Sequence, residues 1–148
     1  MDQNLESIGT VSSLAQGGIS SLDLGNTKRV LFAWDATVPK PLAAALRAEV
    51  YAQLLGADLF VLAVVDGTQP STKTVQPWFH FDRAQRFLKD SLPGLDERHV
   101  LLRIGGFAEL VTEVAIALDA ALVVIPPAEK NPGKLANQIA TRAEVKVL

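Results

Sequence analysis

The residues best suited to binding chemistry lie near the end of the chain. Gly133 opens a predicted helix, and Lys130 and Lys134 flank it. The first N–H groups of a helix have no acceptor within the helix, and that end carries partial positive charge. A backbone of this kind, with two lysines beside it, favours an anion. The pattern therefore predicts a place where a small anion could bind.

The sequence shows no pattern typical of a catalytic centre. His80 and His99 do not have metal-ligand spacing, and each is expected to lie at the surface or to have its hydrogen bonds satisfied within the fold. Glu109 and Glu113 are four residues apart and are expected on a solvated helix face. No P-loop, nucleophile elbow or H-E-x-x-H motif occurs. We expect no catalytic residue and no metal site, and therefore no enzyme.

Composition narrows the class of protein. The chain has 148 residues, of which 49% are hydrophobic and 20% charged, enough for one domain with a buried core. A net charge of -2 argues against nucleic-acid binding, and the absence of cysteine excludes disulfides and thiolate sites. The first residues lack the pattern of a signal peptide, and no apolar run is long enough for a membrane span. These features predict a cytoplasmic protein.

Residues 1–27 differ from the rest in composition. They are rich in Ser, Gly, Asn and Gln, and we expect a flexible N-terminal arm or linker before a domain over residues 28–148. Leu5, Ile8, Val11 and Leu14 recur at a spacing of three, so a short docking helix is the alternative. Gly9 and the serines around it weaken that alternative, because they disfavour a helix.

From residue 28 onward, apolar runs alternate with helical patterns. Runs that are apolar at every position suit parallel strands covered on both faces, and each parallel return needs a crossover. The sequence therefore predicts an α/β fold with an open parallel sheet and helices on both faces. The expected strands span 29–34, 58–65, 99–104, 121–125 and 144–148, and the expected helices 42–55, 77–92, 107–118 and 134–141.

Periodicity also predicts which face of each helix is buried. The residues of the first helix expected to share one face are Leu42, Ala45, Leu46, Glu49, Val50, Gln53 and Leu54. In the helix that begins at Pro77, we expect one face to carry Trp78, Phe81, Gln85 and Leu88, with Phe87 flanking it. The residues expected to face water are Asp82, Arg83, Arg86 and Lys89.

Four stretches together resemble the universal stress protein family, of the adenine nucleotide alpha hydrolase-like superfamily. They are RVLFAWDAT, LLGADLFVLAVVDG, GGFAELVTEVAIALDAALVVIP and GKLANQIATRAEVKVL, and the resemblance covers residues 28–148. It implies a Rossmann-like three-layer α/β/α sandwich with five parallel strands in the order 3-2-1-4-5. It also implies a homodimer through the fifth strand, here with Val145, Val147 and Leu148. Simple packing of the strand end is the alternative for these three residues.

The resemblance also implies where an adenine nucleotide would bind. Asp35 and Ala36, at the end of the first strand, and Val65, at the end of the second, would lie beside the base and ribose. Gly133, Lys134 and Lys130 would lie beside the phosphates. Asp35 has an alternative role as an Asx-type cap of its own loop.

The family's phosphate motif, G-x2-G-x9-G-[S/T], is degenerate here. Its first two glycine positions fall at Pro126 and Glu129, and the loop before Gly133 is several residues shorter. Pro126 and Pro127 have no N–H to donate, and Glu129 adds negative charge. We therefore expect a non-enzymatic regulatory or protective homodimer, without a cofactor, that does not bind ATP firmly. The arm over residues 1–27 could contact a protein partner. The alternative is an ATP- or AMP-binding stress-response switch that uses the shortened loop.

Overall fold

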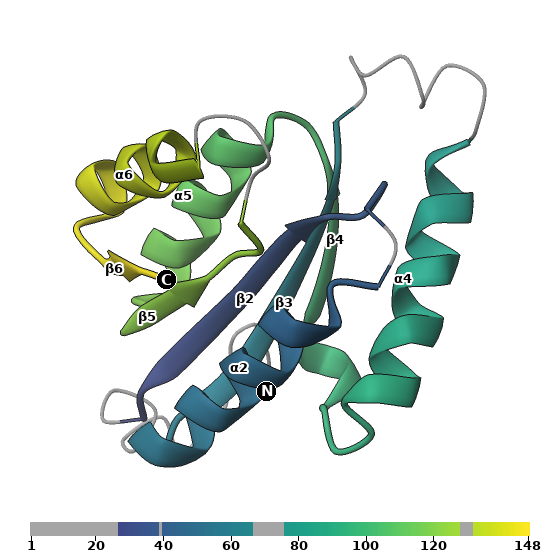
Figure 1. Cartoon of the computed structure of the whole chain (residues 1–148), viewed down its shortest axis with the longest axis horizontal. Helices are drawn as coiled ribbons and strands as arrows, with labels where there is room; N and C mark the ends of the chain where they lie inside the picture. The colour runs from purple at the N-terminus through teal and green to yellow at the C-terminus, as the bar shows by residue number, and fades with distance from the viewer. Residues whose placement is uncertain (1–26, 39, 67–75, 128–131) are drawn as a thin grey trace, which may run out of the picture.

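The computed structural model describes residues 27–38, 40–66, 76–127 and 132–148 (Figure 1). Within these ranges the predicted alternation of strands and helices is confirmed. The strands are β2 (Arg29–Asp35), β3 (Asp58–Val65), β4 (Val100–Ile104), β5 (Leu122–Val124) and β6 (Lys146–Val147). The helices are α2 (Leu42–Leu55), α4 (Pro77–Ser91), α5 (Phe107–Leu118) and α6 (Pro132–Ala143), with a 3-10 turn, η1, at Glu97–His99.

The five strands form one parallel sheet in the order β4-β3-β2-β5-β6. Numbered along the chain, this is the predicted order 3-2-1-4-5. Strand order reverses between β2 and β5, and such a reversal opens a crevice beyond the carboxyl ends of the two strands. The last paired residues of β2 and β5 are Phe32 and Val124, so β2 continues beyond the pairing to Asp35.

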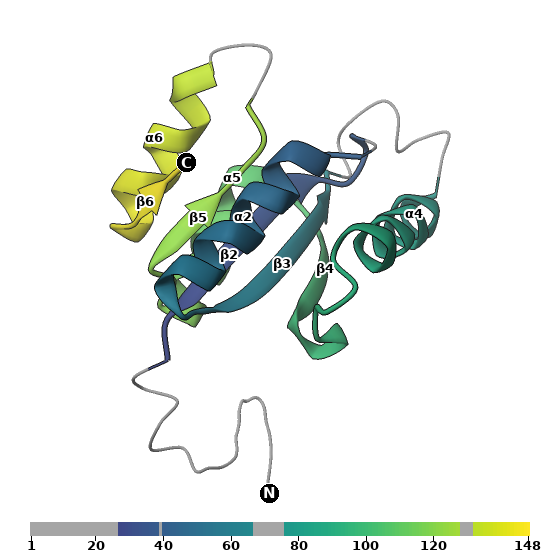
Figure 2. The same ribbon diagram turned by 60° about the horizontal axis from the view of Figure 1, so that its bottom comes forward.

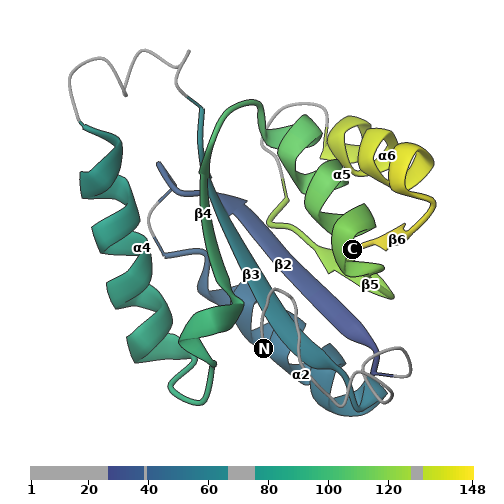
Figure 3. The ribbon, with the colours of Figure 1, turned by 180° about the vertical axis from the view of Figure 1, so that it is seen from behind.

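Helices cover both faces of the sheet (Figures 1 and 3). Alternate residues of β2 point to opposite faces, so Phe32 and Trp34 join a core cluster under α2 and α4. Leu31 and Ala33 join a second cluster under α5 and α6. Because β2 is buried on both faces from Val30 to Trp34, it is apolar at each of these positions, as predicted.

The predicted buried face of α2 is wrong. The helix turns Ala44, Ala45, Ala48 and Ala52 toward the sheet, and Leu42, Leu46, Val50 and Leu54 point outward. The large rings of Phe32 and Trp34 belong to the same core cluster as these alanines, and they leave room only for small side chains beneath the helix. Figure 2 shows α2 as an outer layer, with no other described element over it.

Gly56 ends α2 as predicted. Its backbone is left-handed, with φ +62°, a conformation that glycine adopts without the steric cost that a Cβ brings. Ala57 N–H donates to the Ala52 carbonyl at 2.8 Å, which completes the cap and turns the chain directly into β3. Because β3 begins so soon after this cap, α2 is held against β2 and β3.

Candidate functional site

The carboxyl ends of β2 and β3 lie side by side. Asp35 pairs with Val64 in the sheet register, and Ala36 N–H donates to the Val64 carbonyl at 2.8 Å. Val65, the last residue of β3, is fully buried. The structure therefore brings Asp35, Ala36 and Val65, three of the predicted site residues, to the same edge of the sheet.

Asp35 caps its own loop. Its Oδ1 accepts hydrogen bonds from Thr37 N–H at 2.9 Å and from the Thr37 hydroxyl at 2.7 Å. This is an Asx turn, and it matches the alternative interpretation of Asp35 given above. Both bonds go to the same oxygen, so the carboxylate holds the loop after β2 in place while half-exposed at the strand end.

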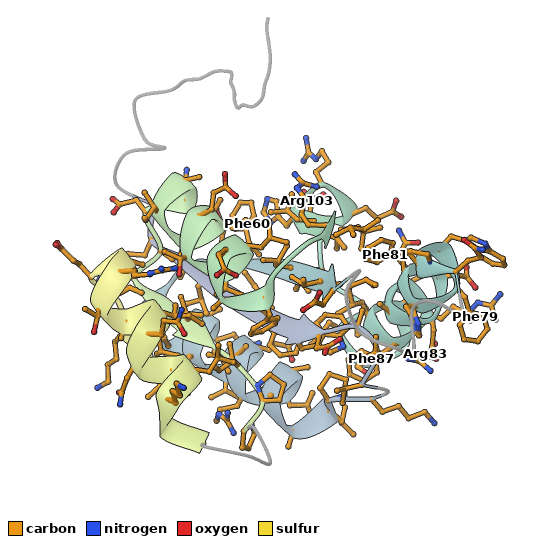
Figure 4. The ribbon with its side chains drawn as sticks, turned by 90° about the horizontal axis from the view of Figure 1, so that it is seen from above. Phe60, Phe79, Phe81, Arg83, Phe87 and Arg103 are labelled. Atoms are coloured by element: carbon orange, nitrogen blue, oxygen red, sulfur yellow. The ribbon has the colours of Figure 1, made fainter. Side chains whose placement is uncertain are left out.

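Helix α4 contributes Arg83, which sequence reasoning had placed in water. Its Nη2 donates to the Ala36 carbonyl at 3.0 Å and to the Thr37 carbonyl at 3.1 Å. These carbonyls lie just beyond β2, and the guanidinium supplies donors where the strand pairing ends. The same guanidinium lies over the Phe79 ring at 5.8 Å, and Figure 4 shows Arg83 and Phe79 together on α4.

His80 is buried beside Arg83, so the expectation of a surface or satisfied histidine is wrong. Only 5% of the residue is exposed, and within the described chain its Nε2 has no hydrogen-bond partner. Its Nδ1 lies 3.4 Å from Arg83 Nη2. Burial first, and then the positive charge of Arg83, lower the pKa of His80, and the negative charge of Asp35 offsets this only in part. A signal was present, because His80 shares a four-residue spacing with buried Ala84 and Leu88.

The lowered pKa of His80 predicts that acid destabilises the fold. The unfolded chain titrates His80 near pH 6.5 and binds its proton more readily than the folded chain. The free energy of unfolding should therefore be highest above pH 6.5 and fall as pH drops below that value. Urea unfolding of wild type and His80→Gln at a series of pH values from above 6.5 downward tests this prediction. The free energy of unfolding should depend less steeply on pH in the variant. An equally steep pH dependence in the two proteins would contradict the assignment of this acid sensitivity to His80.

A cavity of about 320 Å³ lies between the start of α2 and α4, next to this cluster. Its lining includes Trp34, Ala36, Lys40, Arg83 and Phe87. The larger hollow, about 440 Å³, lies between α4 and the start of β4, away from the strand ends. The smaller cavity combines aromatic walls with cationic side chains, an arrangement that can bind a small molecule by burial and charge.

Two of the remaining predicted site residues lie on α6, which begins two residues earlier than predicted. Gly133 and Lys134 are exposed and fall in its first turn, after Pro132. Their N–H groups have no acceptor four residues back within the helix, as the anion prediction requires. In the described chain, no hydrogen bond joins this turn to Asp35 or Ala36. Lys130 and Glu129 lie outside the described residues.

The end of the chain forms the sheet edge next to β5. Leu148 N–H donates to the Val123 carbonyl at 2.8 Å, and the Leu148 carbonyl accepts from Ile125 N–H at 2.9 Å. Val145 and Val147 are half-buried against the cluster under α5 and α6. The alternative interpretation, simple packing of the strand end, predicts this burial. Leu148 is 36% exposed. The side chains of Val145 and Val147 are therefore less available for contact with a second copy of the chain than the sequence suggested.

Neither a metal-binding cluster nor a membrane-spanning helix occurs within the described ranges. No group of three or more His, Cys, Asp or Glu side chains is arranged to hold a metal ion there. No helix in the same ranges combines the length and the apolar character needed to cross a membrane.

Solved structures share this architecture. One from Pseudomonas aeruginosa UCBPP-PA14, assigned to the universal stress proteins, is 20% identical with a TM-score of 0.62, covering 82% of this chain and 46% of that one. A universal stress protein from Archaeoglobus fulgidus is 21% identical with a TM-score of 0.59, covering 82% and 91%. The chain has the universal stress protein fold.

A third structure with this fold is the Arabidopsis thaliana universal stress protein family protein with AMP bound. It is 12% identical with a TM-score of 0.51, covering 82% of this chain and 88% of that one. The chain thus spans less than half of the first structure's length but most of the other two, as expected for a single universal stress protein fold. No protein-family model and no curated protein sequence matches the chain.

Proposed function

We propose that this protein is a non-enzymatic regulatory or protective module of the universal stress protein type, which acts as a homodimer and does not bind ATP firmly. The observation that carries the proposal is the Pro126-Pro127 pair, one residue beyond the end of β5, at the crevice between β2 and β5. A phosphate site of this kind depends on backbone N–H donors, and proline has none. The residues present there fit a triphosphate poorly, so contacts with proteins are the better-supported role.

Among the described strands, β6 has a neighbour on one side only, and this edge supports the homodimer. Successive residues of a strand present their N–H and C=O groups to opposite sides. Both backbone groups of Leu148 bond to the β5 segment, so those of its neighbour Val147 point to the open edge. An unpaired edge can pair with the same edge of a second copy and continue the sheet.

Replacing Val147 with proline tests this interface. Proline removes the outward N–H but can be tolerated on an edge strand, because the bonds to β5 come from Leu148. We expect sedimentation equilibrium to show a wild-type mass of twice 15.9 kDa and a dimer dissociation constant raised about tenfold or more in Val147→Pro. Val147→Ala is the matched control, since it shortens the side chain and keeps the N–H. A monomeric wild type, or an unweakened Val147→Pro dimer, would refute the interface.

The second candidate function is a nucleotide-responsive switch with a shortened phosphate loop. It is favoured by the first-turn N–H groups of Gly133 and Lys134, which have no acceptor within α6, and by Asp35 at the end of β2, the strand next to β5. The Arabidopsis protein with AMP bound shows that this fold can accommodate an adenine nucleotide. This function requires that AMP or ATP stabilise the protein.

A further inference from the structure

The outer face of α2 is apolar and exposed. Leu42, Leu46, Val50 and Leu54, here called the outer ridge, recur every four residues and are 47%, 42%, 50% and 75% exposed. Ala43 and Gln53 lie on the same side, so the ridge carries no charge along the length of the helix. A helix with two apolar sides normally has both of them covered. The sheet covers one side of α2, and something else should cover the other.

The chain enters the described structure beside one end of this ridge. The Lys28 carbonyl accepts the Asp58 N–H at 2.9 Å, and Asp58 follows closely after the end of α2 at Leu55. Residues 1–26 therefore attach to the fold near Leu54. Figure 2 shows the start of β2 next to the last turn of α2.

The chain before Thr27 is long enough to reach the whole ridge. Its apolar positions Leu5, Ile8, Val11 and Leu14, here called the arm stripe, are separated from Thr27 by residues 15–26. Such a linker spans up to about 40 Å when extended. Helix α2 has 14 residues, so it is about 21 Å long. Gly17, Gly18 and Gly25 let the linker turn back along the helix.

Charge favours the same contact. Residues 1–26 contain Asp2, Glu6 and Asp23 and no lysine or arginine, so all of their side-chain charge is negative. Arg47 flanks the ridge on one side and Glu49 on the other, so the local excess of positive charge comes from Lys40, which precedes the first turn of α2. Acidic residues near the amino-terminal end of a helix are also favourable, and α2 has none of its own in its first turn.

We propose that residues 1–26 dock on the outer ridge of α2 in the same chain, with the arm stripe against the ridge. Covalent attachment beside Leu54 gives the arm a high effective concentration at the ridge, which a second copy in dilute solution does not have. Docking covers the apolar side of α2 that the fold leaves bare. The inference does not depend on the proposed function, because the ridge lies on a different face from the β6 edge.

Hydrogen exchange measured by mass spectrometry on the full chain tests the proposal. We expect amides of residues 5–14 to exchange about tenfold or more slowly than an unstructured peptide. In Leu46→Glu/Val50→Glu this protection should disappear, because charge on the ridge cannot be buried against the arm stripe. Ile116→Glu, a change at a residue 58% exposed on α5, is the matched control and should leave the protection intact.

Two results would overturn the proposal. Wild-type residues 5–14 that exchange at the unstructured rate would show that the arm does not dock. Protection that persists in the ridge variant, or that falls on dilution, would place the arm elsewhere or on a second copy. Because the altered residues are exposed, circular dichroism should confirm that both variants remain folded.

Discussion

Replacing Trp34 with alanine is expected to lower the free energy of unfolding by about 3–5 kcal/mol. Trp34 is 1% exposed on the central strand, stacks on Phe32 with ring centroids 5.1 Å apart, and meets the Phe87 ring edge at 6.0 Å. Its side chain joins β2 to α4, so its removal leaves a cavity between two layers. Domains of this size are typically stable by about 5–15 kcal/mol, so the loss is a large share of the total.

The chain supplies a control for this measurement. Trp78, the other tryptophan, is 66% exposed on α4, and Trp78→Ala should change stability by about 0.5 kcal/mol or less. Urea unfolding followed by circular dichroism compares the variants without relying on tryptophan fluorescence. Similar losses in both variants would mean that the rings are not buried as described.

Replacing Ala48 with leucine is expected to cost about 1–3 kcal/mol. Ala48 is fully buried on the face of α2 that packs against the sheet, in the same cluster as Phe32 and Trp34. Leucine is the better residue by usual rules for core positions, yet it cannot fit here without moving the helix. The predicted face of α2 places Ala48 outside the buried stripe, so it would have given little effect for the same change.

Ala43→Leu makes the same chemical change on the outward side of α2. Ala43 is exposed, so its replacement should shift the free energy of unfolding by about 0.5 kcal/mol or less. Alanine and leucine are both strong helix formers, so the two variants should differ in stability only through the packing around the altered side chain. A neutral Ala48→Leu with a destabilising Ala43→Leu would mean that α2 is rotated relative to this structure.

The order of elements could be predicted from sequence because the central strands contain continuous apolar runs and several elements end at a clear signal. Pro41 precedes α2, Gly56 caps it, and Pro126 follows soon after β5. Helix orientation was harder to predict. Periodicity identifies the stripe with the largest apolar side chains. Helix α2 has two apolar sides, and the large rings of Phe32 and Trp34 beneath it decide which of the two faces the sheet.

The candidate site was predicted only in part for a similar reason. Asp35, Ala36 and Val65 follow from strand ends, which a sequence can reveal. His80 and Arg83 join them because α4 packs beside the end of β2, a contact between segments more than 40 residues apart. No local pattern encodes that contact, although the spacing of His80, Ala84 and Leu88 indicated a buried face.

The central claim, that the crevice does not hold ATP firmly, is tested most directly by a thermal shift of the purified protein with Mg²⁺ and ATP, ADP or AMP. A ligand at 100 times its dissociation constant stabilises by about 2.7 kcal/mol, which raises Tm by about 5–10 °C in a protein of this size. Gly133→Glu is a suitable comparison, because among the described residues a Cβ at Gly133 would meet nothing closer than Asn137 Nδ2 at 4.0 Å. We expect no shift at millimolar nucleotide in either protein. A shift of several degrees that Gly133→Glu or Asp35→Ala abolishes would contradict the account and establish a nucleotide-responsive switch.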